Sequence, residues 1–238
     1  GTGALSVHQM GCMMTGDEAY AGSRSFFEME RQIRETMGYE YVIPVHQGRA
    51  GEKILDSVLV SSGALVPGNS HFDTTKAHIE HAGGRAVDCT IQAGKVSEGS
   101  HPFKGNIDLL KLEETIAIHG ADQIAYILIT VTCNSGGGQP VSMENMREVR
   151  RIADRYGLLV VLDAARFAEN AYFIKTRESG YADKPIGEIV REMCDLTDAC
   201  VMSAKKDAPV PVGGFVALRD NALYERLKTP TILFEGFY

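Results

Sequence analysis

The chain has 238 residues, of which 44% are apolar and 23% are charged. These proportions are close to the average for soluble globular proteins and exclude a disordered or fibrous chain. The net charge of −7 gives no support to nucleic-acid binding, which usually shows a basic footprint, and no apolar run is long enough to span a bilayer. The five cysteines are scattered without a C-x-x-C spacing, which predicts reduced thiols in a cytoplasmic protein.

The first half of the chain alternates helical and extended patterns. In 23–38, apolar residues recur near helical spacing and Gly38 is a suitable stop. Further helices are predicted over 48–60 and 108–120, and strands over 39–45 and 84–92.

The middle of the chain carries the clearest pattern. An apolar, β-rich run over 124–133 is followed by a helix over 142–157, with Ser142 as candidate cap and Gly157 as stop. A second apolar run covers 158–164. Strand, helix and strand joined by short loops predict a βαβ crossover, and therefore a parallel sheet that is covered on both faces.

The last third of the chain continues the alternation. It predicts a helix over 186–194 and strands over 198–204 and 213–220. We therefore expect a single α/β domain with a mixed, mostly parallel sheet and helices on both faces.

Polar residues follow four of the predicted strands. Ligands of such sheets bind outside the carboxyl ends of the strands, so these residues are expected to meet at one rim. They are Asn134, Asp163 with Arg166, the pair Lys205 and Lys206, and the run Gln47, Gly48 and Arg49.

The two adjacent lysines raise a choice. Lysine is seldom fully buried without a partner, so Lys205 and Lys206 either reach solvent as a solvated pair or serve chemistry. An imine with pyridoxal phosphate would be such chemistry. That cofactor needs a lysine, a carboxylate for its ring nitrogen, a cup for its phosphate and a flat side chain against its ring.

Other residues supply the remaining parts, and each has a plainer alternative. Asp163 could pair with the ring nitrogen or cap the loop that follows it. Arg166 could reach the ring oxygen or form a surface ion pair. Phe72 could stack on the ring or belong to the core. His78 and His81 lie one helical turn apart and could bind a metal, but a solvated helix face is preferred because no third ligand has suitable spacing.

Gln47, Gly48 and Arg49 lie between a strand and a helix. A helix start offers free N–H groups, a small residue lets an anion approach, and arginine adds a bidentate contact. This turn is therefore a candidate phosphate cup. Neither a G-x-G-x-x-G pattern nor a Walker loop occurs in the chain.

Longer motifs resemble one family. The chain is similar to tryptophanase and tyrosine phenol-lyase, the pyridoxal-phosphate β-eliminating lyases of fold type I. The resemblance covers nearly the whole chain in the family's order. The matching stretches are GDEAYAGSRS (16–25), HQGR (46–49), FDTT (72–75), FKGNIDL (103–109), NSGGGQPVSM (134–143), DAARFAENAYFIK (163–175) and MSAKKDA (202–208).

The resemblance implies a cofactor site for pyridoxal 5'-phosphate in a PLP-dependent transferase-like large domain. It implies that Lys206 forms the imine and that Lys205 tunes the local charge. The other implied cofactor contacts are Asp163 on the ring nitrogen, Arg166 and Asn134 around the ring oxygen, Phe72 on the ring face, and Gln47, Gly48, Arg49 and Ser203 on the phosphate.

The resemblance also implies a reaction. Lys206 removes the α-proton of an amino-acid substrate, and Tyr20 helps to protonate the leaving ring carbon across a subunit interface of a homodimer or homotetramer. An activating potassium ion would be bound near Gly1, Glu18 and Pro211, although the family usually has another residue in place of Pro211.

The substrate is predicted from the residue after the stacking phenylalanine. Asp73 resembles tryptophanase, where an acid can accept a hydrogen bond from the indole N–H, whereas a threonine goes with the phenol enzyme. This favours L-tryptophan, giving indole, pyruvate and ammonium. Tyrosine is the alternative, because stretches such as QIAYI and VSMENMR are closer to the phenol-lyase.

The length of the chain leads to a further expectation. The family's chains are longer, so 1–238 is expected to be the cofactor-binding large domain alone, without the N-terminal segment and the small C-terminal domain that grips the substrate carboxylate. A non-catalytic domain that binds the cofactor is therefore the alternative to an active lyase.

Overall fold

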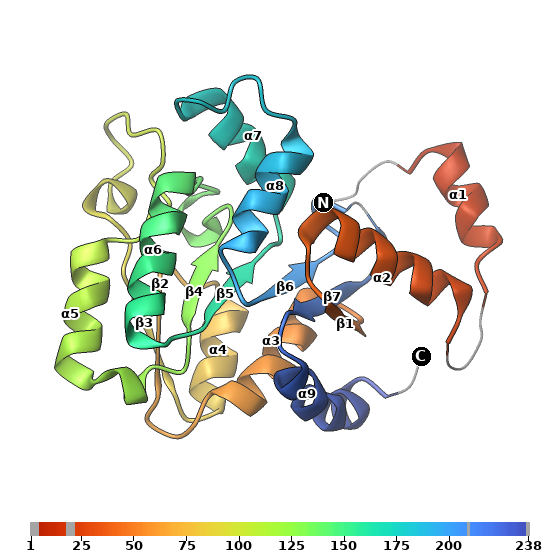
Figure 1. Cartoon of the computed structure of the whole chain (residues 1–238), viewed down its shortest axis with the longest axis horizontal. Coiled ribbons are helices and arrows are strands. Elements are labelled where there is room, and N and C mark those ends of the chain that lie inside the picture. The colour runs from red at the N-terminus through yellow and green to blue at the C-terminus, as the bar shows by residue number, and fades with distance from the viewer. Residues whose placement is uncertain (1–4, 18–21, 209, 237–238) are drawn as a thin grey trace.

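The computed structural model describes residues 5–17, 22–208 and 210–236 (Figure 1). Its strands are β1 Tyr41–Val45, β2 Leu65–Gly68, β3 Arg85–Asp88, β4 Ile127–Thr130, β5 Val160–Asp163, β6 Ala199–Ser203 and β7 Gly214–Leu218. In this described part they form one sheet in the order β1-β7-β6-β5-β4-β2-β3.

The helices connect these strands. They are α1 Val7–Met14, α2 Arg24–Met37, α3 Gly48–Leu59, α4 Asp73–His81, α5 Leu109–His119, α6 Met143–Tyr156, α7 Phe167–Arg177, α8 Ile186–Asp195 and α9 Asn221–Phe234. Short 3₁₀ turns cover Gln92–Lys95, Ala121–Gln123 and Asn134–Gly136.

Strand direction brings the functional loops to one rim. The run β3-β2-β4-β5-β6 is parallel. Strand β7 is antiparallel to both β6 and β1, so β1 points the same way as β6. The loops after β1, β2, β4, β5 and β6 therefore leave the sheet at the same edge.

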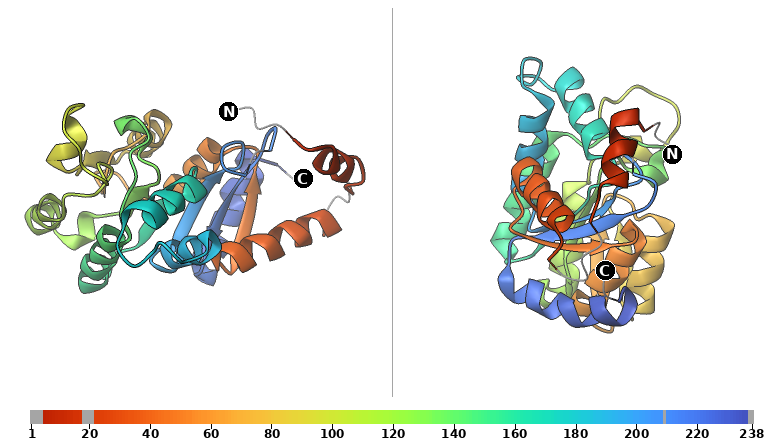
Figure 2. Two further views of the ribbon diagram at one scale, coloured as in Figure 1. Left: turned by 90° about the horizontal axis from the view of Figure 1, so that it is seen from above. Right: turned by 90° about the vertical axis from the view of Figure 1, so that its right-hand side faces the viewer.

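Two apolar layers cover the sheet. Along β5, Val160 and Leu162 contact one layer and Val161 the other, as the two-residue period of a strand requires. Helices α2, α5, α6, α7 and α8 form the first layer, and α3, α4 and α9 form the second (Figures 1 and 2). The core thus lies on both faces of the sheet.

The predicted elements are confirmed wherever the pattern was strongly periodic. The Ser142 hydroxyl accepts from the Asn145 N–H at 3.1 Å and caps α6. Gly38 ends α2 with a φ of 80°, a conformation that glycine adopts without strain. The fold class, a mixed and mostly parallel sheet between helices, is confirmed as well.

Sequence reasoning also missed some elements and predicted others to be longer than they are. The strands predicted over 84–92 and 124–133 are shorter, at β3 and β4. Strand β2 was missed because it contains Pro67 and Gly68, residues that usually argue against a strand. Helices α1, α7 and α9 were not predicted, and α4 was anticipated only as a helix face around His78 and His81.

A buried acid on α3 predicts a pH dependence of stability. Asp56 is 1% exposed and accepts from the Tyr126 hydroxyl at 2.7 Å, while its Oδ2 has no hydrogen-bond partner in the described chain. Burial, and secondarily the charge of Glu52, raises the pKa of Asp56 to about 7 from 3.8. The folded state thus binds a proton more tightly than the unfolded state. The stability that this proton contributes is complete below about pH 4 and is lost as the pH rises to about 7.

The variant Asp56→Asn is expected to flatten this dependence, because asparagine still accepts from Tyr126 but cannot ionise. The free energy of unfolding of the wild type should fall by on the order of 4 kcal/mol more than that of the variant between pH 4 and pH 8. Urea unfolding at both pH values measures the difference. An equal change in the free energy of unfolding of the two proteins between pH 4 and pH 8 would contradict a raised pKa at Asp56.

Candidate active site

A cavity opens at the carboxyl rim of the sheet, on the face covered by α3 and α4. Its volume is about 130 Å³. It is lined by Gln47, Gly48, Arg49, Glu52, Phe72, Thr74, Asp163, Val201, Ser203, Lys205 and Lys206. The loops after β1, β2, β5 and β6 all contribute to it, so groups that lie more than 150 residues apart in the sequence share one space.

The turn after β6 holds Lys206 at the cavity. The Lys206 N–H donates to the Ser203 carbonyl at 3.2 Å, and the Ala204 N–H donates to the Gly213 carbonyl at 3.0 Å. The next residue, Asp207, accepts from the Ala168 N–H at 2.7 Å at the start of α7. The turn is therefore tied to two neighbouring segments, which limits the movement of the lysine.

The environment of Lys206 favours the neutral amine. The side chain is half-buried, and this burial is the largest cause that lowers its pKa. The charges of Arg166 and Lys205 act in the same direction, while Asp163 opposes them. The charge of Lys205 thus lowers the pKa of Lys206 as predicted, but desolvation lowers it more.

Lys205 has a different position from its neighbour. Its Nζ lies 3.5 Å from the Gln47 Oε1, which makes this a long and weak hydrogen bond. It is half-buried. Neither lysine is therefore a fully solvated loop residue.

Asp163 ends β5 at the floor of the cavity. Its Oδ1 accepts from the Ala165 N–H at 3.1 Å, and the carboxylate keeps part of its surface open toward the cavity. Burial raises its pKa to about 6, with a further increase from the Glu52 charge, and Lys206 acts against both. Near neutral pH this group is therefore poised to exchange a proton with a basic nitrogen beside it.

The start of α3, where an anion site was predicted, lines the same cavity. The helix has no side-chain cap, because Gln47 occupies the cap position without bonding the first turn. Helices α2, α6 and α9 are capped by their own serine or aspartate. A Cβ at Gly48 would lie 2.8 Å from the Ser203 Cβ. The predicted phosphate cup (Gln47, Gly48, Arg49 and Ser203) therefore combines a helix start that has no side-chain cap with a close contact to Ser203 that only glycine permits at position 48.

Phe72 lines the same cavity and lies immediately before α4. Its ring centroid is 5.7 Å from the Lys206 Nζ, and the side chain is half-buried. We refer to Phe72 as the ring wall. A flat ligand beside Lys206 would contact it face on.

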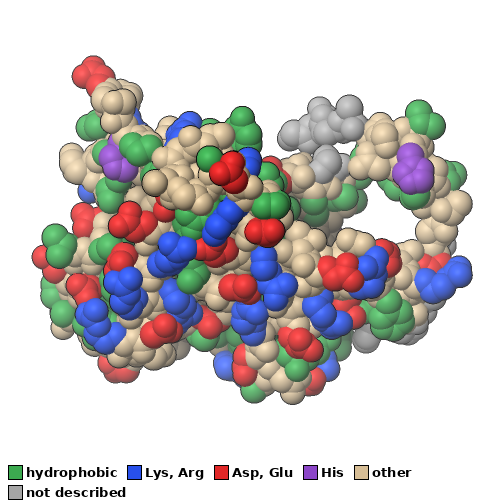
Figure 3. All heavy atoms as spheres, turned by 45° about the horizontal axis from the view of Figure 1, so that its top comes forward, with side chains coloured by type: hydrophobic (Ala, Val, Ile, Leu, Met, Phe, Trp, Pro, Cys, Tyr) green, Lys and Arg blue, Asp and Glu red, His purple; other side chains and the backbone are tan. Residues whose placement is uncertain are grey.

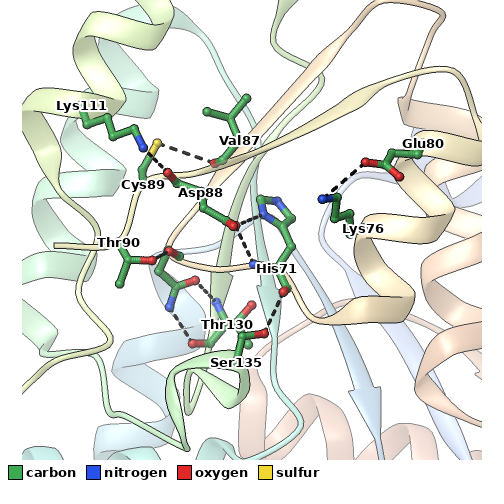
Figure 4. A network of polar contacts seen from close by, with 11 residues as sticks. His71, Lys76, Glu80, Val87, Asp88, Cys89, Thr90, Lys111, Thr130 and Ser135 are labelled. Atoms are coloured by element: carbon green, nitrogen blue, oxygen red, sulfur yellow. Dashed lines mark hydrogen bonds and ion pairs between the residues drawn. The ribbon is translucent and has the colours of Figure 1, made fainter. Parts of the chain in front are cut away.

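A polar network fixes the loop that carries the ring wall (Figure 4). The His71 Nδ1 and Asp88 Oδ1 lie 2.8 Å apart, and the Ser135 hydroxyl donates to the His71 carbonyl at 2.8 Å. The Asn69 side chain bridges to Thr130, accepting from its N–H at 2.9 Å and donating to its carbonyl at 2.9 Å. The loop between β2 and α4 is thus bound to β3 and to the segment after β4.

Three residues of the cavity lining were missed by sequence reasoning, namely Glu52, Thr74 and Val201. The Glu52 carboxylate accepts from the Thr74 hydroxyl at 2.9 Å and from the Thr75 hydroxyl at 2.5 Å. Glu52 lies one turn after Gly48 on α3, and both Glu52 and Thr74 line the cavity. The helical spacing from the predicted phosphate cup was the available signal.

Some predicted residues lie outside the cavity lining. Asn134 begins a 3₁₀ turn and is half-buried. The Arg166 Nε lies 3.8 Å from the Glu169 carboxylate, so the surface ion pair is present, although its charge also acts on Asp163 and Lys206. Asp73 is exposed at the start of α4 and accepts from the Thr74 N–H at 2.6 Å.

The predicted potassium ligands and the catalytic tyrosine are mostly untested. Gly1, Glu18 and Tyr20 lie outside the described residues. Pro211 is exposed. Within residues 5–17, 22–208 and 210–236, no group of three histidine, cysteine, aspartate or glutamate side chains could hold a metal ion, and no helix in the same ranges has the length and apolar character to cross a membrane.

Sequence comparisons place the chain among named enzymes. The model of the beta-eliminating lyase family matches residues 1–237. A tryptophanase from Salinibacter ruber is 51% identical over 237 residues, and a tyrosine phenol-lyase from Symbiobacterium thermophilum is 49% identical over 236 residues. Each alignment covers at least 99% of this chain but only 50% to 52% of the relative. The chain therefore spans about half the length of the curated relatives it matches.

Solved structures share the fold at low identity. A protein from Exiguobacterium, whose name groups it with aromatic amino acid beta-eliminating lyases and threonine aldolases, has a TM-score of 0.69 and 15% identity. The match covers 99% of this chain and 62% of that protein. A structure from Listeria monocytogenes named for L-allo-threonine aldolase gives 0.69 and 14%, covering 99% and 61%. These likenesses confirm the predicted α/β large-domain fold of fold type I.

Proposed function

Because this chain belongs to the beta-eliminating lyase family, we propose that it acts as a pyridoxal-phosphate-dependent carbon–carbon lyase. The reaction would be β-elimination on an aromatic amino acid. L-tryptophan is the preferred substrate, with indole, pyruvate and ammonium as products. Residues 1–238 would be the cofactor-binding large domain of this enzyme.

One observation carries the proposal. A lysine amine, a carboxylate, an aromatic ring and an uncapped helix start converge on one cavity at the carboxyl rim. The Lys206 Nζ lies 5.7 Å from the centre of the Phe72 ring. Each of these features is common alone, whereas their meeting at one place matches all four requirements of the cofactor.

The residues present fit pyridoxal phosphate. The phosphate cup would hold the phosphate dianion at the positive end of α3. Lys206 would hold the group covalently through Nζ. Asp163 would face the ring nitrogen, and the ring wall would cover one face of the ring.

Bound pyridoxal phosphate supplies an aldehyde carbon and a ring that accepts electrons from the substrate. Asp163 would hold a proton at the ring nitrogen, because its carboxylate lies at the end of β5 and lines the cavity. Once the substrate's amino group has replaced it on the cofactor, the freed Lys206 amine would accept the proton from the substrate Cα, and its lowered pKa would keep a larger share of the amine in the neutral form that can accept it. A proton for the leaving ring carbon is assigned to Tyr20, which stays a prediction.

Two measurements test this function. Borohydride reduction in the presence of pyridoxal phosphate, followed by peptide mapping, should place a stable pyridoxyl group on Lys206. Pyruvate formation should then be assayed with tryptophan, tyrosine and an S-alkyl cysteine. A label on another residue, or none, would overturn the cofactor assignment.

The same assays separate the alternatives. A tyrosine phenol-lyase would form pyruvate and phenol from tyrosine faster than indole from tryptophan. A non-catalytic domain would take the label but release no pyruvate from any of the three substrates.

The preference for tryptophan is assigned to Asp73. Its carboxylate lies at the start of α4, next to the ring wall. Replacing it by threonine removes an acceptor for the indole N–H. The variant Asp73→Thr is therefore expected to lower the ratio of kcat/KM for tryptophan to that for tyrosine by about tenfold or more, the range for a hydrogen bond to a charged group. Steady-state kinetics with both substrates measure the ratio, and an unchanged ratio would remove Asp73 from specificity.

A homo-oligomer is the third part of the proposal. Helix α1 stands apart from the body of the molecule (Figures 1 and 2), and none of its residues is buried. Val7, Met10, Met13 and Met14 are all more than half exposed. On the face shown in Figure 3, acidic and basic side chains are interspersed over the body. That face therefore offers no patch of a single charge as an alternative contact surface to the exposed apolar side chains of α1.

The double variant Met10→Gln and Met13→Gln is expected to dissociate the oligomer, because glutamine keeps the helix but removes the apolar contact. Light scattering after size-exclusion chromatography measures the mass. Leu110→Gln on α5 is the matched control, since that side chain is 74% exposed on a helix of the body. Identical masses for the wild type and the double variant would contradict assembly through α1.

Two further predictions stay open. The potassium site at Gly1, Glu18 and Pro211 is testable as a difference in pyruvate formation between potassium and sodium buffers of equal ionic strength. The cytoplasmic location rests on the cysteine pattern alone.

A further inference from the structure

The Glu52 carboxylate joins two helices at the cavity. It lies on α3 and accepts from the Thr74 hydroxyl at 2.9 Å through Oε2 and from the Thr75 hydroxyl at 2.5 Å through Oε1. Both carboxylate oxygens are therefore engaged by α4. Thr75 is 3% exposed, so its hydrogen bond is shielded from water and costs more to lose than a surface contact.

Both helices contribute residues to the lining of the cavity. Helix α3 begins with Gly48 and Arg49 of the phosphate cup, one turn before Glu52. Helix α4 begins directly after the ring wall, Phe72. A carboxylate that fixes α4 to α3 therefore also fixes the ring wall relative to the phosphate cup, and no other side-chain hydrogen bond links these two helices among the described residues.

We propose that Glu52 is a positioning residue of this site, which clamps α4 onto α3 and so sets the spacing between the ring wall and the phosphate cup. This role rests on the function proposed above. A cofactor held at its phosphate by one helix and at its ring by the other depends on that spacing, because misplacement by about 1 Å already weakens binding and catalysis.

The same carboxylate acts on the reacting groups through its charge. It raises the pKa of Lys206 and of Asp163. The other charged groups that act on Lys206 are Asp163 from β5, Arg166 from the segment after β5, and Lys205 beside it. Glu52 thus offsets part of the effect of the two cations and keeps the lysine protonated to a higher pH than it would be without this charge.

Two kinds of variant separate the clamp from the charge. Thr75→Val removes a hydroxyl but keeps the shape of the side chain and the charge of Glu52, whereas Thr75→Ser keeps the hydroxyl. Glu52→Gln keeps one acceptor oxygen and removes the charge. Glu80→Gln is the matched control, because Glu80 is an exposed acid on α4 that lies 3.8 Å from Lys76.

The clamp is tested by the dissociation constant of pyridoxal phosphate, measured by equilibrium dialysis. Thr75→Val is expected to raise it about tenfold, the effect of losing roughly 1.4 kcal/mol of interaction. Thr75→Ser should bind within about threefold of the wild type, and Glu80→Gln should bind like the wild type. Rescue by serine distinguishes positioning from a general loss of packing, which serine would make worse than valine.

The charge is tested by the rate at which Lys206 reacts with trinitrobenzenesulfonate in the cofactor-free protein. In Glu52→Gln the midpoint of the pH–rate profile should move to lower pH, and the rate at pH 7 should rise about threefold or more. Peptide mapping assigns the reaction to Lys206.

The outcomes remain distinguishable. Wild-type binding by Thr75→Val together with an unchanged profile for Glu52→Gln would overturn the role of Glu52. A wild-type protein that takes no pyridoxyl label at Lys206 would instead overturn the proposed function. Circular dichroism at 222 nm identifies any variant that fails to fold. If Thr75→Val fails to fold, Thr75→Ser still tests the clamp, because tenfold weaker binding of pyridoxal phosphate by Thr75→Ser would contradict the clamp.

Discussion

Replacing Lys206 by alanine is expected to abolish the stable pyridoxyl label and to lower pyruvate formation at least about 10³-fold. The physical reason is that one amine would serve two purposes, covalent attachment of the cofactor and acceptance of the substrate α-proton. Removal of a general base alone costs about 10² to 10⁴ in rate. The variant should fold normally, because Lys206 is only half-buried and its backbone N–H still donates to Ser203.

The neighbouring lysine is the internal comparison. Lys205→Ala removes a cation of the same kind, one residue away, yet should retain the pyridoxyl label at position 206. Mass mapping of both variants after borohydride reduction decides between the two lysines. A label that survives in Lys206→Ala, or that is lost only in Lys205→Ala, would contradict attachment of the cofactor at Lys206.

The variant Asp163→Asn is expected to separate attachment from turnover. Asparagine has the same shape but cannot carry the negative charge that holds a proton on the ring nitrogen. Pyruvate formation should fall by about 10²-fold or more, the usual cost of removing one preorganised electrostatic contact. The Lys206 label should persist, because the Asp163 charge raises the pKa of that lysine and its removal leaves more of the amine neutral.

The comparison for this variant is Asp220→Asn. Asp220 caps α9 and accepts from the Leu223 N–H at 2.6 Å, and asparagine is an equally good cap. Both variants make the same chemical change at the end of a strand. The absorbance of the bound cofactor and the rate of pyruvate formation should change in Asp163→Asn only. Parallel losses in both variants would mean that Asp163 acts through stability.

The raised pKa of Asp163 has a consequence for cofactor loading. In the cofactor-free protein this pKa is about 6, so the Asp163 carboxyl group is protonated below that pH and negatively charged above it. If the proposed cofactor binds, Asp163 would be the residue that shares a proton with its ring nitrogen. The same burial that makes the free carboxylate unfavourable therefore strengthens its attraction to a positively charged partner.

The candidate site was largely predictable because parallel strands end at one rim. Asp163, Lys206 and Gly48 each follow a strand that the apolar pattern marks, and the rim rule then brings them together. Eight of the predicted cofactor and catalytic residues line the cavity: Gln47, Gly48, Arg49, Phe72, Asp163, Ser203, Lys205 and Lys206. Ser203 was assigned through family motifs alone, whereas Phe72 was already a candidate before the resemblance was considered.

Other features could not be predicted from the residues alone. The Glu52 contact with Thr74 and Thr75 depends on how α3 and α4 meet. The start and end of α4 were not predicted, because its apolar face is small, with only Thr75 and Ile79 buried. The cap that Asp207 places on α7 joins two segments about forty residues apart, a contact with no local signature.

The sequence by itself determined the α/β class, the order of most strands and helices and the types of reactive group, because hydrophobic period and turn residues act over short distances. The tertiary structure alone decided which of those groups meet, which helix start stays uncapped beside Ser203, and how far burial moves the pKa of Lys206 and Asp163. These properties depend on the distance between segments remote in the chain and on the water excluded between them, and neither quantity is encoded in any local stretch of residues.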